Sequence, residues 1–256
     1  MIQSDLNAIY VVVARELIKF TRERGRLIST LARPLIWLFL VGGGMSRVVS
    51  PTMGVPYIQF IFPGIIGMTI LFSSIFSSIS IIWDKEFGFM KEMLAAPVSR
   101  FSIVVGKALS GTAVSTIQAL IIVLLFPILG LRLNLAQIVL VLCVSIMLSF
   151  CLSSLGILIA SFYESFESFS VIMNFIVMPM FFLSGAMYPV QLLPHVLGVI
   201  SRLNPLTYGI DALKHMIFAP SALITHDFPL GLDITVITAS SIAFVVIAGN
   251  VFERRK

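Results

Sequence analysis

The chain has 256 residues, of which 58% are hydrophobic and only 11% are charged, and its mean hydropathy is +1.06. Soluble domains are about half apolar and about a quarter charged, so this composition excludes a water-soluble core and predicts an all-α polytopic membrane protein. The formal net charge of +5 comes from basic residues beside apolar runs. This placement indicates lipid headgroups, and not nucleic acid, as the partner of those charges.

Residues 1–26 are predicted to form an amphipathic helix lying on the inner leaflet, and no cleaved signal peptide is expected there. Apolar and basic residues repeat at helical spacing on two different faces: Ile9, Val13, Leu17 and Phe20 on one, and Arg15, Lys19, Arg22 and Arg26 on the other. The alternative is a basic flank without helical order.

Six apolar runs follow, and each is long enough for a membrane-spanning helix, which needs about 20 apolar residues. They are residues 27–49, 57–82, 103–131, 133–162, 171–188 and 234–252, the fifth being slightly short. The whole chain, 1–256, is therefore expected to be a single transmembrane domain. Six crossings would place both termini on the same side of the membrane.

The distribution of basic residues assigns that side. Thirteen of the 17 Lys and Arg residues lie in or near the amino-terminal segment, the connection between the second and third runs, and the carboxyl-terminal tail. Loops rich in Lys and Arg stay in the cytoplasm, so both termini are predicted to be cytoplasmic.

The predicted spans lack two features that would supply energy for transport. No ionisable residue falls at the middle of a span, and Arg33 and Lys107 lie near cytoplasmic ends, where long side chains are expected to reach the headgroups. The pair Gly106-Lys107 is followed by Ala108 and does not form a phosphate-binding loop. We therefore expect that neither an ion gradient nor nucleotide binding by this chain drives transport.

The connection at residues 83–101 reads WDKEFGFMKEMLAAPVSRF, with five apolar side chains among charges and a proline that would end a helix. This pattern predicts a short amphipathic helix in the cytoplasm that packs into a groove on another protein. The alternative is a loop resting on the headgroups.

Four motifs make the chain resemble the permease subunits of type-2 ABC exporters, which include daunorubicin-resistance and nodulation-factor export permeases. These motifs are residues 86–100, Gly106-Lys107, the stretch FLSGAMYP at 182–189, and LNPLTYGIDAL at 203–213. Many relatives have arginine after the last motif, whereas this chain has Lys214, which keeps the charge but loses the bidentate fork.

The resemblance implies a multi-pass permease in the inner membrane of a prokaryote, working as a homodimer or with a related permease. It implies docking of a cytoplasmic ABC ATPase, which would hold ATP and Mg, while this chain would bind no cofactor. Outward movement of an apolar or amphipathic drug, lipid or glycan is expected, with antibiotic resistance among the roles.

The resemblance also nominates two sets of residues. The ATPase-coupling set is Glu86, Gly88, Met90, Glu92, Met93, Leu94, Pro97 and Arg100. In it, Met90, Met93 and Leu94 would fill the groove, Glu86 and Glu92 would pair with basic groups at its rim, and Pro97 would fix the exit angle. A second set, in the outer segment at 189–233, is Asn204, Pro205, Tyr208, Asp211 and Lys214. It would begin a helix capped near Asn204 or form part of a gate.

Two alternatives from other functional classes stay open at this point. One is a membrane-embedded enzyme with a metal site on the outer face, drawn from His195, His215, His226, Asp211 and Asp227. The other is a passive channel or helical scaffold, which would also explain spans without charges.

Overall fold

A computed structural model describes residues 2–53, 56–95, 98–163, 165–218 and 226–254. Its α-helices are α1 (Ile2–Arg22), α2 (Arg24–Ile36), α3 (Gly43–Met53), α4 (Tyr57–Glu86), α5 (Phe89–Ala95), α6 (Arg100–Val123), α7 (Leu135–Phe162), α8 (Phe166–Ile172), α9 (Met178–Phe182), α10 (His195–Leu203), α11 (Pro205–Ile217) and α12 (Leu230–Arg254). Two π-helical segments, η1 (Trp37–Gly42) and η2 (Met173–Val177), and one 3-10 turn, η3 (Val190–Leu192), join some of them.

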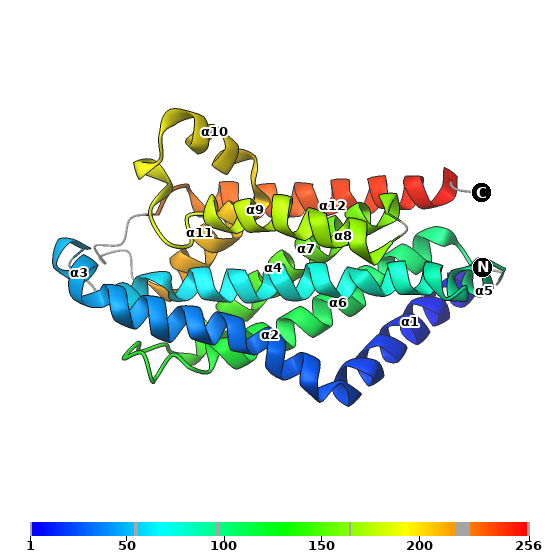
Figure 1. The fold of residues 1–256 in the computed structure, drawn as a ribbon, viewed down its shortest axis with the longest axis horizontal. Coiled ribbons are helices and arrows are strands. Elements are labelled where there is room, and N and C mark those ends of the chain that lie inside the picture. The colour runs from blue at the N-terminus through cyan, green and yellow to red at the C-terminus, as the bar shows by residue number, and fades with distance from the viewer. Residues whose placement is uncertain (1, 54–55, 96–97, 164, 219–225, 255–256) are drawn as a thin grey trace.

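The long helices form one bundle around α4 (Figure 1). Helix α4 contacts α6, α7, α11 and η1, and 94% of its most apolar window is buried, compared with 22% for α12. A helix that is apolar on all sides belongs inside a bundle, which fits the central place of α4. Helix α12 lies against α6, α7 and α11 with much of its surface exposed.

Within the described residues, four helices are long and apolar enough to cross a membrane: Tyr57–Glu86, Arg100–Val123, Leu135–Phe162 and Leu230–Phe252. The first predicted span, 27–49, is helical but divided by the π-helical segment η1. The fifth predicted span, 171–188, ends at Phe182, six residues before its predicted end, because the chain turns through Gly185, whose φ is +73°. Six crossings therefore stay a prediction.

The third predicted span, 103–131, is too long. Helix α6 ends at Val123, and residues 124–130 form consecutive turns that include Pro127. Gly130 closes them with a φ of +72°, a conformation that glycine adopts without strain. The fourth span follows at once, because Asn134 and Gln137 form a reciprocal capping box at the start of α7.

Small residues let the central helices approach closely. A Cβ atom added at Gly111 of α6 would lie 2.7 Å from the Ser153 hydroxyl of α7, and one at Gly156 of α7 would lie 2.8 Å from the Ser78 hydroxyl of α4. Such contacts are typical of helix packing in lipid, where little hydrophobic force acts between helices.

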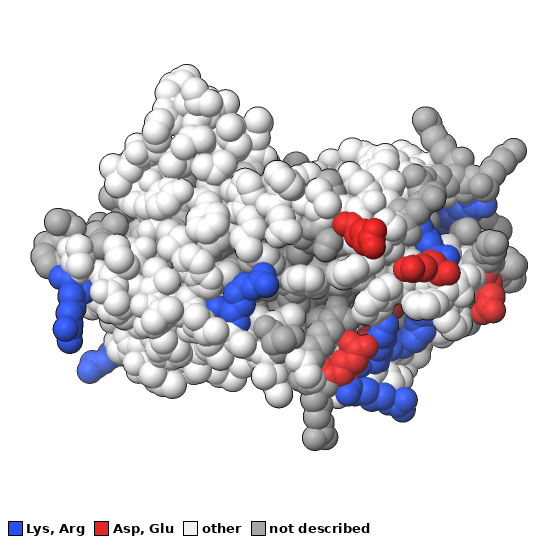
Figure 2. Space-filling model, viewed as in Figure 1, with Lys and Arg blue, Asp and Glu red and all other residues white. Residues whose placement is uncertain are grey.

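The bundle has two distinct ends. The terminal end carries the first residues of α1, the last residues of α12 and the short helix α5, whereas the opposite end carries α3, α10 and α11 (Figure 1). On the face drawn in Figure 2, acidic side chains gather toward the terminal end, and much of the remaining surface is uncharged.

Candidate functional site

The segment predicted to meet an ATPase is a helix hairpin at the terminal end. Helix α4 ends at Glu86, Gly88 turns the chain with a φ of +82°, and α5 begins at Phe89. A side chain at Gly88 would meet open space but would be strained by this φ, so the turn requires glycine for its backbone conformation.

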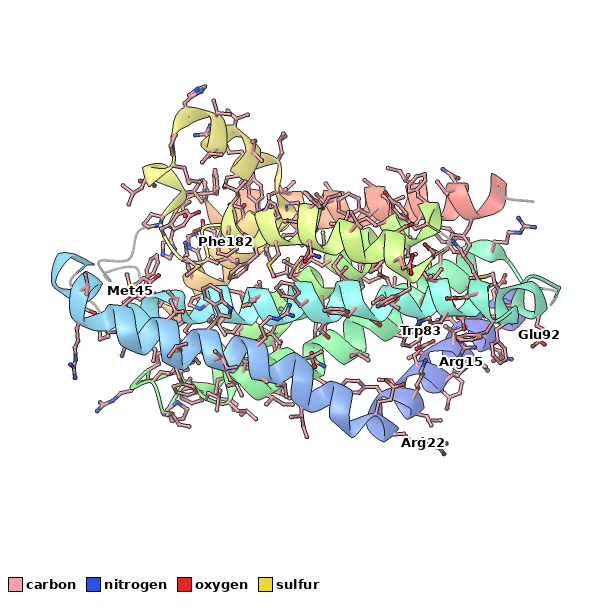
Figure 3. The ribbon with its side chains drawn as sticks, in the orientation of Figure 1. Arg15, Arg22, Met45, Trp83, Glu92 and Phe182 are labelled. Atoms are coloured by element: carbon pink, nitrogen blue, oxygen red, sulfur yellow. The ribbon has the colours of Figure 1, made fainter. Side chains whose placement is uncertain are left out.

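The α4–α5 hairpin, from Glu86 through α5, divides its side chains into an exposed group and a buried group. Phe87 and Phe89 are 72% and 52% exposed, and Glu86 and Glu92 are exposed as well. Glu92 lies at the outer edge of the bundle (Figure 3). The two exposed aromatic rings form apolar surface beside the two glutamates at this turn.

Met90 faces the other way, which differs from its expected place in a partner's groove. It is only 7% exposed and belongs to the chain's own core, and Met93 packs partly against the same core. Pro97 and the Leu94 side chain lie outside the described residues. Arg100 donates to the Phe252 carbonyl of α12 at 3.1 Å, which ties the exit of the segment to the last helix.

A buried charge cluster lies behind the hairpin and consists of Glu16, Asp84 and Lys107, which are all buried, with the exposed Arg15 at its edge. The Lys107 Nζ donates to Glu16 at 2.8 Å, to Asp84 at 2.5 Å and to the Ser80 hydroxyl at 3.1 Å. Arg15 donates to both oxygens of Asp84, at 3.1 and 2.9 Å. The cluster joins α1, the end of α4 and the start of α6.

The prediction for Lys107 was therefore wrong. The side chain does not extend to the headgroups but is 4% exposed, because two carboxylates lie within its reach. Burial alone would raise the pKa of Glu16, but the charge and hydrogen bond of Lys107, with those of Arg15, outweigh it and hold that pKa below its usual value. Glu16 is thus ionised within the cluster at neutral pH.

Helix α1 packs on the bundle along the face that carries Val12, Glu16 and Phe20, all of which are buried. Gly106 allows this approach, since a Cβ there would lie 3.1 Å from the Val12 Cβ. The predicted helix is confirmed, with its end at Arg22. Glu16 lies four residues from both Val12 and Phe20, so helical spacing places it on the same face as two apolar residues. This position indicates that Glu16 is buried with a basic partner, but the sequence pattern does not identify that partner.

Other contacts fix the hairpin to its surroundings. The Lys85 Nζ donates to the carbonyl oxygens of Ala160, Ser161 and Tyr163, at the carboxyl end of α7. Lys19 of α1 lies 4.5 Å from the centre of the Trp83 ring. Figure 3 shows Arg15 and Trp83 at this junction of α1 and α4. These contacts join the α4 arm of the hairpin to α1 and α7.

The outer set of residues gathers around the start of α11. Asn204 is its N-cap, accepts from the Leu206 amide at 3.0 Å, and donates to the Met180 carbonyl of α9 at 2.6 Å. Pro205 occupies the first turn, where its missing amide costs no hydrogen bond. The Tyr208 hydroxyl donates to the Arg202 carbonyl at 2.8 Å. The expected helix and cap are both present.

Asp211 and Lys214 hold the chain that enters α12. The two Asp211 oxygens accept from the backbone amides of Asp227 and Phe228, at 3.0 and 2.8 Å. The Lys214 Nζ is buried and lies 3.3 Å from the Asp227 carboxylate. The imidazoles of His215 and His226 stack with their centres 3.6 Å apart, whereas His195 is exposed on α10.

Comparison with known proteins places these features in a family. A family model described as ABC-2 type transporter matches residues 7–218, which include α1, the α4–α5 hairpin, the buried charge cluster and α11. The chain belongs to this family.

Three relatives of the permease illustrate the range of the match. The inner membrane transport permease YadH of Escherichia coli K12 is 27% identical over 96% of this permease and 95% of its own length. The ycf38 protein of Cyanophora paradoxa is 31% identical over 82% and 74%. Nodulation protein J of Rhizobium meliloti is 26% identical over 73% and 72%.

Membership of this family fixes the general role of the permease. It is a multi-pass membrane subunit of an ABC transporter, without an ATPase site of its own, and the family works with an ABC ATPase. This role favours transport over the scaffold and enzyme alternatives.

Proposed function

We propose that this chain is the permease subunit of an ATP-driven exporter and that a separate cytoplasmic ATPase docks on its α4–α5 hairpin. ATP and Mg would bind to that ATPase and not to the permease. The proposal includes six membrane crossings, cytoplasmic termini and assembly as a dimer with a second copy or a related permease. The shared end of the two termini supports the orientation (Figure 1).

The observation that carries this proposal is the exposed surface of the α4–α5 hairpin. Phe87 and Phe89 offer apolar surface, and Glu86 and Glu92 flank it with negative charge. An apolar centre with a charged rim is the usual composition of a specific protein interface. The match to the ABC-2 type transporter family supports an ABC ATPase as the proposed partner.

The buried charge cluster gives the hairpin a way to transmit force. ATP binding can shift a two-state permease only if the ATPases contact its two conformations differently. A hairpin joined to α1 and α6 through Lys107 would move as one piece with them, because breaking that buried pair is costly. The outer set around Asn204 and Tyr208 is proposed to act at the external gate.

The lining of an aromatic pocket supports the proposal that the substrate is apolar or amphipathic. It lies between α2, α4 and α8, and its lining includes Arg33, Phe72, Phe76, Trp83 and Phe166. The Arg33 guanidinium lies 4.8 Å from the centre of the Phe72 ring and is the basic side chain in this lining. Drug-like and lipid-like molecules with an anionic group fit this combination of surfaces.

The docking proposal is tested by isolating the tagged permease from native membranes in mild detergent and measuring the co-purified ATPase by quantitative mass spectrometry. Phe89→Ala and Glu92→Lys are expected to reduce the ATPase at least tenfold. Phe175→Ala and Glu167→Lys are matched controls, because both side chains are exposed but lie on η2 and α8. The controls should retain the ATPase.

Loss of the ATPase only in the α5 variants would support the proposed surface. Wild-type permease that purifies without any ATPase, in a detergent that preserves a known ABC complex, would contradict the proposal. Equal retention in Phe89→Ala, Glu92→Lys and both controls would show that another surface makes the contact.

A further inference from the structure

The junction of α11 and α12 at the opposite end holds a group of polar side chains that includes Asp211 of the outer set. We propose that Asp211, His215 and Asp233, with the Phe228 carbonyl, form a binding site for a divalent transition-metal ion. The inference is independent of the proposed ATPase docking, since it concerns the outer segment and not the α4–α5 hairpin.

Asp233 is the observation that points to a ligand. Its side chain is 0% exposed, and neither carboxylate oxygen has a hydrogen-bond partner among the described residues. A buried carboxylate without donors is strongly unfavourable and requires a positive charge or a proton. The nearest basic group is the His215 imidazole, whose Nε2 lies 3.9 Å from the Asp233 Oδ2.

The donor atoms already converge. Asp211 and His215 are four residues apart on one face of α11, and Asp233 faces them from the first turn of α12. One ligand atom from each of the three residues lies within 4.8 Å of the other two. Atoms bound to one tetrahedral ion at about 2.0–2.2 Å lie roughly 3.3–3.6 Å apart, so a small closure would complete the site.

The Phe228 carbonyl supplies a fourth donor. Its oxygen lies 3.0 Å from the His215 Nε2, a contact that is a hydrogen bond only if that nitrogen carries the proton. With the proton on Nδ1, both atoms would face the same ion as ligands. The Asp211 carboxylate holds this carbonyl in place, because it accepts the backbone amide of the same residue.

The local charge also favours a cation. Asp211, Asp227 and Asp233 face one lysine, Lys214, which lies against Asp227. His226 stacks on His215 and restrains its ring, and the His226 Nδ1 has no hydrogen-bond partner among the described residues.

The mixture of donors defines the class of metal. One imidazole nitrogen with carboxylate and carbonyl oxygens suits a borderline ion such as Zn²⁺ or Mn²⁺ and does not favour Cu(I), which prefers sulfur. Bound metal would clamp α12 to α11 and would thereby fix the outer segment against the last helix.

The test uses Zn²⁺ alone as the probe and the full-length permease, purified with a tag that lacks histidine, stripped with a chelator and returned to lipid nanodiscs. Calorimetric titration is expected to give one Zn²⁺ per chain with an affinity in the micromolar range or tighter. Asp233→Asn and His215→Gln should each weaken binding at least tenfold. His195→Gln is the matched control, because this exposed histidine lies at the same end of the bundle on α10.

X-ray absorption of the loaded wild-type protein provides a second readout and should show nitrogen and oxygen ligands that include one imidazole. If Asp233→Asn does not fold, the His215→Gln titration and this spectrum still decide the proposal. Absence of Zn²⁺ binding would overturn it and would mean that a proton neutralises Asp233. Full binding by His215→Gln, or loss of binding in His195→Gln, would also overturn it.

Discussion

The two ends of the permease bury ionisable groups in opposite ways. At the terminal end, Arg15 and Lys107 face Glu16 and Asp84, so the charges balance, and no polar side-chain atom of the four is buried without a partner. At the opposite end, three aspartates face Lys214 and two stacked histidines, and both Asp233 oxygens lack a hydrogen-bond partner.

This difference separates a charge network that holds helices together from one that could bind a ligand. A buried network with every member satisfied holds its elements in one arrangement, and removing one member leaves the others unpaired. A network with unsatisfied buried atoms is unfavourable as it stands, so it indicates that a proton or an ion completes it. The first network therefore suits transmission of force, and the second suits binding.

The largest effect is expected from breaking the balanced cluster. Lys107→Met removes the buried cation between Glu16 and Asp84 and should lower the free energy of unfolding by about 3–5 kcal/mol, since it leaves two buried carboxylates with only the exposed Arg15 as a partner. Equilibrium unfolding in mixed micelles, followed by circular dichroism, measures the change. Arg132→Met, at an exposed position between α6 and α7, is the control and should change stability little.

The same cluster allows a stricter test. The triple variant Lys107→Met, Glu16→Gln, Asp84→Asn removes the three buried charges together and leaves the exposed Arg15 in water, so it should recover most of the stability that the single variant loses. A triple variant less stable than Lys107→Met would contradict the view that uncompensated charge, and not lost packing, causes the destabilisation.

Much of the fold was predictable because lipid imposes simple rules on sequence. Runs of about 20 apolar residues predicted α4, α7 and α12 as spanning segments with boundaries a few residues off. The same rule failed between Val123 and Gly130, because hydropathy does not register the turn that Pro127 and Gly130 form. It also does not resolve η1, where the first predicted span becomes π-helical.

The candidate site was predicted by motif and corrected by packing. Residues 83–101 were identified as a partner-binding segment, but an amphipathic pattern does not say which face the chain keeps for itself. Met90 is buried in the chain's own core, whereas the side chains of Phe87 and Phe89 are exposed. The Lys107 partners lie 91 and 23 residues away in sequence, so no local pattern could identify them.

The opposite end is held by close backbone contact, and a second prediction tests this. A Cβ at Gly64 of α4 would lie 2.5 Å from the Ala186 carbonyl oxygen, so Gly64→Ala forces the backbone apart and should destabilise by about 1–3 kcal/mol. Gly198→Ala is the matched control, because a Cβ there meets nothing within 4 Å and α10 gains a better helix former. Equal stability of the two variants in the same unfolding assay would contradict this packing.

A smaller effect should distinguish the two buried clusters directly. In metal-free permease, Asp233→Asn removes a buried carboxylate that has no donor, so stability should change by less than about 1 kcal/mol or should rise. Asp84→Asn is the matched comparison and should destabilise clearly, because its carboxylate accepts from Lys107 and Arg15. A large loss in Asp233→Asn would show that Asp233 has a favourable partner even without metal.

The smallest effect concerns the pH dependence of Glu16. Its pKa is lowered in the folded state, so its contribution is present above the unfolded value of about 4.3 and is lost as the pH falls through the folded pKa. Wild-type permease should therefore lose more stability between pH 6 and pH 3 than Glu16→Gln. In Lys107→Met the charge and hydrogen bond of Lys107 are lost while burial and the contacts of Arg15 remain, so the pKa of Glu16 should rise and the stability lost on acidification should be smaller than in wild type. Unfolding curves at several pH values measure both slopes, and the same slope in wild type and Glu16→Gln would mean that Lys107 does not hold Glu16 in its ionised form.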